Sequence, residues 1–364
     1  MNIKKIALAL LLLVALVSCR RDTPVEVIDP LNTSAGFYLL NQGNMGSNKA
    51  SLDYYDYATS DYKLDIFQKI NPDVTFKLGD VGNDLQIYGN RMYAVINLSN
   101  MVEVMDSKTG KHIGNFTVPN CRYIAFHGGK AYVTSYAGTV GVKGQIGFVA
   151  EIDTLTLKET RRVEVGYQPE GLTVVGNKLY VANSGGYEAP NYDRTVSVID
   201  LSTMKEIKKI DVAINLNTIQ QDSKGNIYVL SRGDYDKVVP AMYKIDTKTD
   251  TPTPLAIGQL NNFIIVDDVI YAYTYDYSTM AKEFLKCDLR KEKPTTEKFL
   301  SDEASGLITA PYCIAYNKNR EEFYITDAKS YTIPGEVFCF AKDGTLVWKN
   351  TTGDIPCAIA FVGK

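Results

Sequence analysis

The sequence has few of the side chains on which catalysis and metal binding most often depend. Among its 364 residues are two histidines, His112 and His127, one tryptophan and six cysteines. Neither histidine stands at a metal-ligand spacing from a cysteine, so the pattern offers no zinc-type or haem-type site. The sequence therefore argues against a metal centre and against catalysis by a histidine general base.

A surplus of basic residues is also absent. The chain has 39 lysine and arginine residues against 42 aspartate and glutamate residues, a formal net charge of −3. Nucleic-acid-binding proteins gather basic residues on one face, and no such cluster occurs beyond the N-terminus. We therefore expect no nucleic-acid partner.

Long hydrophobic runs are missing except for one at residues 6–17. This run is too short to cross a bilayer as a helix. It follows Lys4 and Lys5, and a short apolar run after basic residues is typical of a signal peptide. We therefore expect residues 1–18 to be a signal peptide.

The segment Leu16-Val17-Ser18-Cys19 resembles a bacterial lipobox. The resemblance implies cleavage before Cys19, a diacylglycerol on its sulfur and an acylated amine, and two or three acyl chains suffice for stable anchoring. Residues 19–34 would then be a lipidated tether, and the lipid would be the only contact with the membrane. The alternative is an ordinary secretory signal with an incidental cysteine.

Five cysteines remain after Cys19, an odd number that cannot pair completely within the chain. Four of them lie in apolar strand patterns, where cysteine is usually a small buried hydrophobic residue. The fifth, Cys121, lies in a predicted loop beside Arg122 and Tyr123. We expect Cys121 to be the most accessible.

One pattern recurs seven times between residues 35 and 364. Each copy has an apolar strand, a tight turn, a strand centred on tyrosine, a loop, a strand ending in aspartate and a last strand. The repeated residues are Tyr38, Tyr93, Tyr132, Tyr180, Tyr228, Tyr271 and Tyr324, and Asp56, Asp106, Asp153, Asp200, Asp246, Asp288 and Asp343. Repeats of this length with four strands indicate a β-propeller. The sequence predicts an all-β, seven-bladed propeller over residues 35–364, with four antiparallel strands, a to d, in each blade.

The ends of the repeat array predict how the ring closes. The first copy has no strand a, and a partial eighth copy stands at residues 355–361. If this C-terminal strand joins the first blade, no sheet edge is left open. We therefore expect a closed ring that is monomeric on its own.

The repeated aspartates invite a catalytic interpretation, but their positions favour a structural one. Each lies where strand c enters the c–d turn, and an aspartate there can accept hydrogen bonds from the turn's backbone amides. Seven equivalent carboxylates around a rim cannot converge on one substrate. We predict that they cap turns.

Ligand binding is expected where the copies differ, in the b–c loops and in the d–a loops between blades. Both sets emerge on one face, and loops on a rigid scaffold often carry binding residues. Tyrosine is abundant there and offers a flat apolar ring with a hydroxyl group. The predicted ligand-binding residues are Asn41, Asn97, Arg122, Tyr123, Tyr136, Tyr167, Asn183, Tyr187, Arg232, Tyr235, Tyr275, Tyr277, Tyr312 and Tyr331.

The segment Lys178-Leu-Tyr-Val-Ala-Asn183, with Val196-Ser-Val-Ile-Asp200 and Leu-Ser-Thr-Met-Lys205 after it, resembles the YncE-like seven-bladed propellers. With the lipobox, the chain is similar to the DUF5074-type propeller lipoproteins of Bacteroidetes. One branch of these, the BtuG-like proteins, captures cobalamin at the cell surface beside a TonB-dependent transporter.

This resemblance implies a non-catalytic protein that binds cobalamin or a related corrinoid as a ligand, without a catalytic cofactor. It also implies a lipid anchor in the outer membrane, exposure at the cell surface and a TonB-dependent outer-membrane transporter as partner. Because the predicted face has no histidine, we expect no protein imidazole to replace the lower ligand of cobalt.

Two other classes of function are compatible with the sequence. One is an extracellular propeller enzyme that acts on a glycan or a lactone, and the other is an adaptor that binds an envelope protein or peptide. The acidic loop residues that an enzyme could use are Glu188, Asp193, Asp234, Asp236 and Asp276. Nothing in their spacing fixes a pair at catalytic separation.

Overall fold

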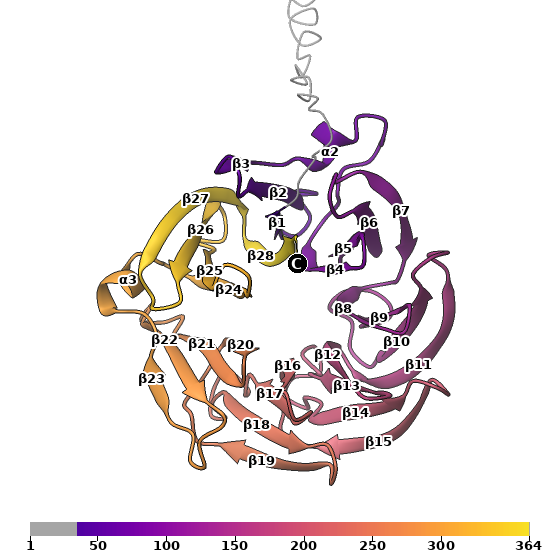
Figure 1. The fold of residues 1–364 in the computed structure, drawn as a ribbon. Coiled ribbons are helices and arrows are strands. Elements are labelled where there is room, and N and C mark those ends of the chain that lie inside the picture. The colour runs from indigo at the N-terminus through magenta and orange to yellow at the C-terminus, as the bar shows by residue number, and fades with distance from the viewer. Residues whose placement is uncertain (1–34, 364) are drawn as a thin grey trace, which may run out of the picture.

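Seven four-stranded antiparallel sheets form a ring in the computed structural model, which describes residues 35–363 (Figure 1). The predicted all-β, seven-bladed propeller is thus confirmed. The expected signal peptide, Cys19 and the tether lie outside the described residues. No helix in the described part of the chain is long and apolar enough to cross a membrane.

Each blade consists of four strands that follow one another from the centre of the ring outward. Blade 1 contains β28 (Pro356–Val362), β1 (Gly36–Asn41), β2 (Ser51–Asp56) and β3 (Asp61–Lys63). Blade 2 contains β4 (Gly82–Tyr88), β5 (Arg91–Ile96), β6 (Met101–Asp106) and β7 (His112–Thr117). Blade 3 contains β8 (Cys121–His127), β9 (Lys130–Ser135), β10 (Ile146–Asp153) and β11 (Glu159–Tyr167). Blade 4 contains β12 (Pro169–Val175), β13 (Lys178–Asn183), β14 (Thr195–Asp200) and β15 (Lys205–Asp211).

The other three blades repeat this order. Blade 5 contains β16 (Leu216–Gln221), β17 (Ile227–Ser231), β18 (Ala241–Asp246) and β19 (Thr251–Leu255). Blade 6 contains β20 (Asn262–Val266), β21 (Val269–Tyr275), β22 (Lys282–Asp288) and β23 (Thr296–Lys298). Blade 7 contains β24 (Pro311–Asn317), β25 (Glu322–Asp327), β26 (Pro334–Ala341) and β27 (Leu346–Asp354). Two short helices, α2 (Phe67–Ile70) and α3 (Asp302–Gly306), lie in the connections before β4 and β24.

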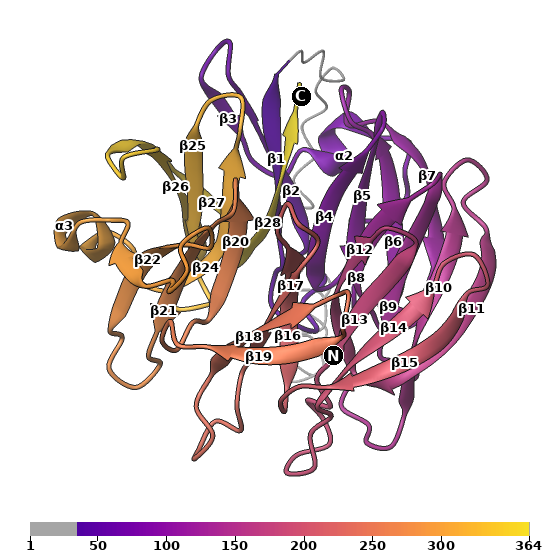
Figure 2. The same ribbon diagram turned by 60° about the horizontal axis from the view of Figure 1, so that its bottom comes forward.

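The ring closes through the two ends of the propeller. Strand β1 pairs with β2 on one side and with β28 on the other, in a register that runs from Gly36 opposite Val362 to Leu40 opposite Ala358. Figure 2 shows β1 and β28 side by side. Every residue of β1 is buried, so the C-terminal strand supplies the missing inner strand of blade 1, as the partial eighth copy predicts.

The repeated residues have the structural roles that their positions predict. Six of the seven repeated tyrosines are buried in the cores between blades, and Tyr271 is half-buried. The repeated aspartates accept hydrogen bonds from backbone amides of the c–d turns; Asp200, for example, accepts from the amides of Ser202 and Thr203 at 2.8 and 3.1 Å. The prediction that the aspartates cap turns is confirmed.

The innermost strands differ from regular strands in one respect. In six blades a β-bulge or irregularity interrupts the pairing between strand a and strand b near the first residues of strand a, and blade 6 alone is regular there. Residues in a bulge do not take part in the ladder, and their side chains can be turned in a new direction. The residues of strand a that the pairing skips are Asn83, Arg122, Tyr123, Glu170, Gly171, Asn217, Thr218, Tyr312, Cys313 and Cys357.

Deletion of residues 355–364 should unfold the protein, because it removes β28 and exposes the unpaired edge of the fully buried β1. We expect loss of the cooperative thermal transition measured by circular dichroism and rapid degradation by a protease. Deletion of residues 363–364 alone is the control and should leave both unchanged. A shortened chain without β28 that still unfolds cooperatively at the original temperature would contradict this closure.

Candidate functional site

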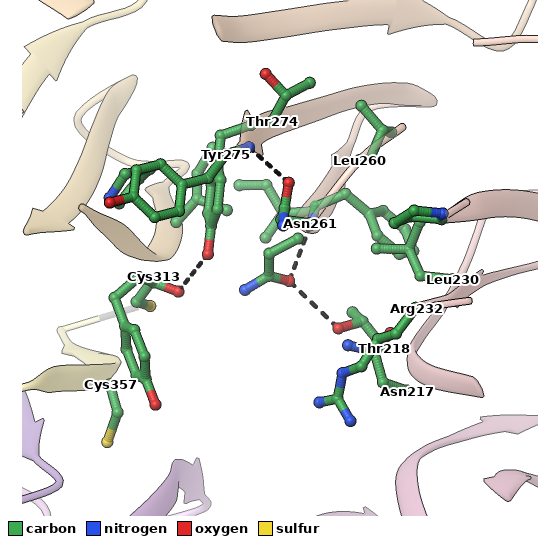
Figure 3. Close-up of a pocket in the computed structure, with 18 of the residues that line it drawn as sticks. Asn217, Thr218, Leu230, Arg232, Leu260, Asn261, Thr274, Tyr275, Cys313 and Cys357 are labelled. Atoms are coloured by element: carbon green, nitrogen blue, oxygen red, sulfur yellow. Dashed lines mark hydrogen bonds between the residues drawn. The ribbon is translucent and has the colours of Figure 1, made fainter. Parts of the chain in front are cut away.

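A pocket of about 1570 Å³ occupies the centre of the ring and reaches the b–c loops on one face. Its wall is formed by inner strands and by loop residues from several blades (Figure 3). Neutral amides, tyrosines and apolar side chains share this wall. The carboxamide side chains in it are Gln42, Asn83, Gln86, Asn97, Asn217, Gln220, Gln259, Asn261 and Asn262.

The bulges of the inner strands supply much of the wall. Of the ten strand-a residues that the pairing skips, eight line the pocket: Asn83, Arg122, Tyr123, Asn217, Thr218, Tyr312, Cys313 and Cys357. The other two, Glu170 and Gly171, lie in the bulge of blade 4. The irregular start of strand a is therefore the local structure that turns side chains toward the pocket.

Three charged residues from three neighbouring blades meet beside the pocket. Glu170 lies in β12 of blade 4 and is 1% exposed. Arg122 of blade 3 donates from Nε and Nη2 to Glu170 Oε2 at 3.2 and 3.1 Å, and Arg232, from the b–c loop of blade 5, donates from Nη1 to Oε1 at 3.0 Å. The hydroxyl of Tyr136 donates to the same Oε1 at 2.5 Å. We call these four residues the Arg–Glu–Arg cluster.

The cluster holds Glu170 in its charged form. Burial alone would raise the pKa of Glu170, but the positive charges of Arg122 and Arg232 and the hydrogen bonds from Tyr136 and Arg232 outweigh burial and lower that pKa to about 2. A carboxylate with so low a pKa is a poor proton acceptor near neutral pH. The cluster is therefore suited to orienting charge and unsuited to acid–base catalysis.

Aromatic rings surround the cluster. The Arg122 guanidinium carbon lies 4.8 Å from the centroid of the Tyr136 ring, and Tyr136 meets Tyr187 edge to face at 5.4 Å. Burial raises the pKa of Tyr123 to about 12 and the pKa of Tyr136 well above its usual range. These tyrosines are neutral at physiological pH, so they do not cancel the charge of the arginines.

Asp84, in β4 of blade 2, is a carboxylate that belongs to the pocket wall. Burial raises its pKa to about 6, although hydrogen bonds from the Ile124 amide, the Gln86 side chain and the Leu85 amide act in the opposite direction. Those donors lie at 3.1, 3.0 and 2.8 Å. The hydrogen bond from the Ile124 amide links blade 2 to blade 3, so Asp84 has a structural role at the contact between these blades.

Blades 6, 7 and 1 form the opposite wall, which is aromatic and contains two thiols. Tyr273 donates its hydroxyl to the Tyr312 carbonyl at 2.7 Å, and Tyr312 donates its own hydroxyl to Gln42 Oε1 at 2.6 Å. Figure 3 shows Cys313 and Cys357 across the pocket from Asn217 and Arg232. The pocket thus has two arginines on one side, and tyrosines and thiols together with the charged residues Asp276, Lys282 and Glu283 on the other.

The structure brings nine of the fourteen predicted binding residues into the pocket wall. These are Asn97, Arg122, Tyr123, Tyr187, Arg232, Tyr235, Tyr275, Tyr277 and Tyr312. Tyr136 supports the wall through Glu170, and Tyr331 meets Tyr312 edge to face at 6.0 Å.

The remaining predicted residues form hydrogen bonds within the sheets and loops of the blades. Asn41 and Asn183 are fully buried, and each donates to serine hydroxyls of its own sheet, Ser51 and Ser197 respectively. The backbone amide of half-buried Tyr167 donates to Asp193 at 2.9 Å. None of the three belongs to the pocket wall.

Sequence reasoning missed Glu170, Asp84 and most of the amides. All of these except Gln42, which follows β1, lie in or just before strand a, whose apolar pattern is typical of a core strand. A polar residue directly before an apolar strand a was the available signal, as in Pro169-Glu-Gly-Leu172 and Asn83-Asp-Leu85.

The expectation that Cys121 is the most accessible cysteine is wrong. Cys121 begins β8 and is fully buried, and its thiol contacts the Ile96 and Met101 carbonyls at 3.5 and 3.6 Å. Cys313 and Cys357 are instead partly exposed and line the pocket. All five cysteines of the described residues are free thiols.

Metal ligands do not gather in the part of the chain that the structure describes: no group of three or more His, Cys, Asp or Glu side chains could hold an ion there. His112 begins the outer strand β7, where its ring contacts Glu103, and His127 ends β8. Neither belongs to the pocket wall.

Fold and pocket together define the class: a seven-bladed β-propeller with a large polar pocket at its centre. The chain belongs to the family described as "Domain of unknown function (DUF5074)", whose model matches residues 35–349. The predicted family is thereby confirmed, and the BtuG-like branch stays a prediction. The sequence has no match among curated proteins.

Solved structures with the same ring come from several bacteria. A quinoprotein alcohol dehydrogenase-like protein from Bacteroides thetaiotaomicron is 17% identical, with a TM-score of 0.63 over 90% of this chain and 78% of that one. A putative 6-phosphogluconolactonase from Bacteroides uniformis is 11% identical, with a TM-score of 0.62 over 91% and 100%. The periplasmic gluconolactonase of Pseudomonas aeruginosa is also 11% identical, with a TM-score of 0.57 over 90% and 99%. At these identities the likeness shows the fold.

Glu170→Gln should destabilise the protein by about 3–5 kcal/mol, the usual cost of leaving a buried charge without its partner. Urea unfolding at pH 7 measures this free energy. Because the pKa of Glu170 in the folded protein lies below its unfolded value, its contribution is present above about pH 4.3 and is lost as the pH falls toward 2. The control is Glu159→Gln, which removes a surface pair with Arg162 and should cost about 0–1 kcal/mol. Equal losses would contradict the proposed role of the cluster.

Asp84 should make the protein more stable at pH 5 than at pH 7. Its folded pKa of about 6 lies above its ordinary value, so its stabilisation is complete below about pH 4 and is lost as the pH rises through 6. Asp84→Asn should therefore reduce the difference in unfolding free energy between pH 5 and pH 7. Asp200→Asn is the control, because the pKa of Asp200 is lowered by its turn. An undiminished difference in Asp84→Asn would refute this assignment.

Proposed function

We propose that this protein binds cobalamin or a related corrinoid in the central pocket without transforming it. The observation that carries the proposal is the pocket wall, which holds nine carboxamide side chains together with tyrosines. Cobalamin is a large disc fringed with amide groups, and an amide donates and accepts hydrogen bonds as another amide does. A wall of amides is therefore complementary to such a rim.

The size of the pocket supports a large ligand. Pockets for drug-sized molecules usually measure roughly 300–1,000 Å³, and this one measures about 1570 Å³. A small sugar or amino acid would leave most of that volume to water. A corrinoid, with its ring and nucleotide loop, is a ligand of a size that matches this volume.

Several of the amides have groups to spare for a ligand. Asn217 Oδ1 is buried without a hydrogen-bond partner among the described residues. Asn261 Oδ1 accepts a hydrogen bond from the Tyr275 amide at 2.6 Å, whereas Asn261 Nδ2 donates no hydrogen bond within residues 35–363. Gln259 is exposed at the pocket wall. A buried polar atom without a partner is costly, and a ligand amide would satisfy Asn217.

Tyrosines at the mouth provide apolar area for the ligand. Tyr235 is 73% exposed and Tyr277 is 70% exposed, and both line the pocket. Large aromatic side chains exposed to water are typical of binding surfaces. Their rings can pack on the apolar parts of a corrin while their hydroxyl groups stay in water.

Delivery to a TonB-dependent transporter, from a lipid anchor at the outer membrane, is the second part of the proposal. It rests on the lipobox-like segment at Cys19 and on the family resemblance. Apolar side chains at the tips of the b–c loops around the pocket mouth would give the partner a contact surface. These are Met45, Val238, Val239, Met280 and Ile333.

A lactone-hydrolysing enzyme is the second candidate, favoured by Asp84. A carboxylate in a pocket with a pKa near 6 is suited to act as a general base. Its three hydrogen bonds to neighbouring groups argue for the structural role instead. Turnover of gluconolactone that is lost in Asp84→Asn would establish the enzyme and reject the non-catalytic function.

Calorimetry with cyanocobalamin tests the first proposal. We expect binding at micromolar protein concentration, weakened about tenfold by Asn217→Ala or Tyr277→Ala, since each removes a contact at the pocket wall. Gln221→Ala, an exposed glutamine outside that wall, should bind as the unchanged protein does. No heat of binding at that concentration would reject the proposal.

The same complex reports on the lower ligand of cobalt. The pocket wall of the described residues contains no histidine. We therefore expect the bound corrinoid to keep its own lower base, and its absorption spectrum to be that of a corrinoid with this base coordinated. A spectrum of a displaced lower base would contradict this arrangement of the pocket.

A further inference from the structure

The charges of the Arg–Glu–Arg cluster do not balance. Two guanidinium groups share one carboxylate, which leaves one net positive charge beside the pocket. Glu170 cannot neutralise more, because Oε1 already accepts from Tyr136 and Arg232, and Oε2 accepts twice from Arg122. Both arginines are largely covered, with side chains 18% and 32% exposed.

Hydrogen-bond donors are also in surplus. Arg122 uses Nε and Nη2, and Arg232 uses Nη1 alone, for the bonds to Glu170. Within residues 35–363, Nη1 of Arg122 and Nε and Nη2 of Arg232 have no hydrogen-bond acceptor. Both arginines belong to the pocket wall, so an acceptor that enters the pocket can reach these donors.

No second carboxylate of the described residues competes for the arginines. The main groups that raise the pKa of Arg122 and of Arg232 are Glu170 and neighbouring tyrosines. The pocket wall also contains Asp84, Asp276 and Glu283. Asp84 and Asp276 accept hydrogen bonds from backbone amides of their own segments, at 2.8 Å from Leu85 and Ser278.

We propose that the Arg122–Arg232 side of the pocket is an anion subsite, which binds an oxyanion group of the ligand, either phosphate or carboxylate. A partly desolvated positive charge with unused guanidinium donors is unfavourable until an anion pairs with it. Guanidinium groups match oxyanions geometrically and bind them through charge-assisted hydrogen bonds. The surplus charge thus selects a ligand that carries negative charge at one end.

This inference rests on the proposed function only in using the same pocket. Cobalamin carries one phosphodiester, in its nucleotide loop. If cobalamin is the ligand, the anion subsite fixes its orientation: the nucleotide loop faces blades 3 to 5, and the rest of the corrin rim faces the tyrosines of blades 6 and 7.

The experiment titrates the full mature chain with inorganic phosphate, pyrophosphate and acetate at constant ionic strength, and follows thermal unfolding and heat of binding. We expect saturable stabilisation by at least one of these anions. Arg232→Gln should weaken it about tenfold or more, the usual effect of removing a charge-assisted hydrogen bond. Arg194→Gln is the control, because Arg194 is an exposed arginine that pairs with Asp211.

Phosphate or pyrophosphate preferred over acetate would identify a phosphate group, and the reverse order would identify a carboxylate. If Arg232→Gln unfolds too readily to be titrated, Arg232→Lys keeps the charge but loses the planar fork of donors and should still weaken anion binding. Stabilisation that is absent, or equal in Arg232→Gln, Arg194→Gln and the unchanged protein, would overturn the inference. Titration with cyanocobalamin distinguishes the two proposals. Anion binding without corrinoid binding would support the anion subsite and reject the corrinoid as ligand. Corrinoid binding that Arg232→Gln leaves unchanged would support the corrinoid as ligand and reject the anion subsite.

Discussion

The pairing of β1 with β28 is the interaction on which the whole molecule depends. It joins residues 36–41 to residues 356–362 and turns a row of seven sheets into a ring without an open inner edge. Once the ring is closed, the seven inner strands are held at fixed positions around the channel. The shape of the pocket is therefore fixed by the ring itself, so a ligand that bound there would lose little conformational entropy to order the wall.

A ring of similar blades carries a pocket with two dissimilar sides. Blades 3, 4 and 5 contribute Arg122, Glu170 and Arg232, which tie three neighbouring blades together through one carboxylate. Blades 6, 7 and 1 contribute tyrosines, amides and the two pocket thiols. The difference arises in single residues of the bulges and b–c loops, while the repeated tyrosines and aspartates serve the cores and turns. Regularity builds the scaffold, and departures from it build the site.

The fold could be predicted from the sequence because the signals are periodic. Seven tyrosines, seven aspartates and the fragment at residues 355–361 define blade number, strand order and closure. The loop tyrosines and Arg232 could be predicted for the same reason, since loop position follows from the repeat, whereas Arg122, expected in a loop, lies in the bulge of β8. Glu170 and Asp84 were missed because they lie within inner strands whose pairing is irregular, and a bulge has no sequence period. The burial of Cys121 was missed because β8 begins earlier than its apolar pattern.

The bulges bear on how such proteins diversify. A skipped residue that lines the pocket and bonds no other blade contributes little to the ring, so its replacement changes the pocket at small cost; Glu170, which bonds two neighbouring blades, is not of this kind. The inner strands thus divide two tasks: their paired positions hold the sheets together, and most of their skipped positions line the pocket. Such a division allows one scaffold to acquire new binding partners by point mutation alone, with no insertion of loops and no rearrangement of blades.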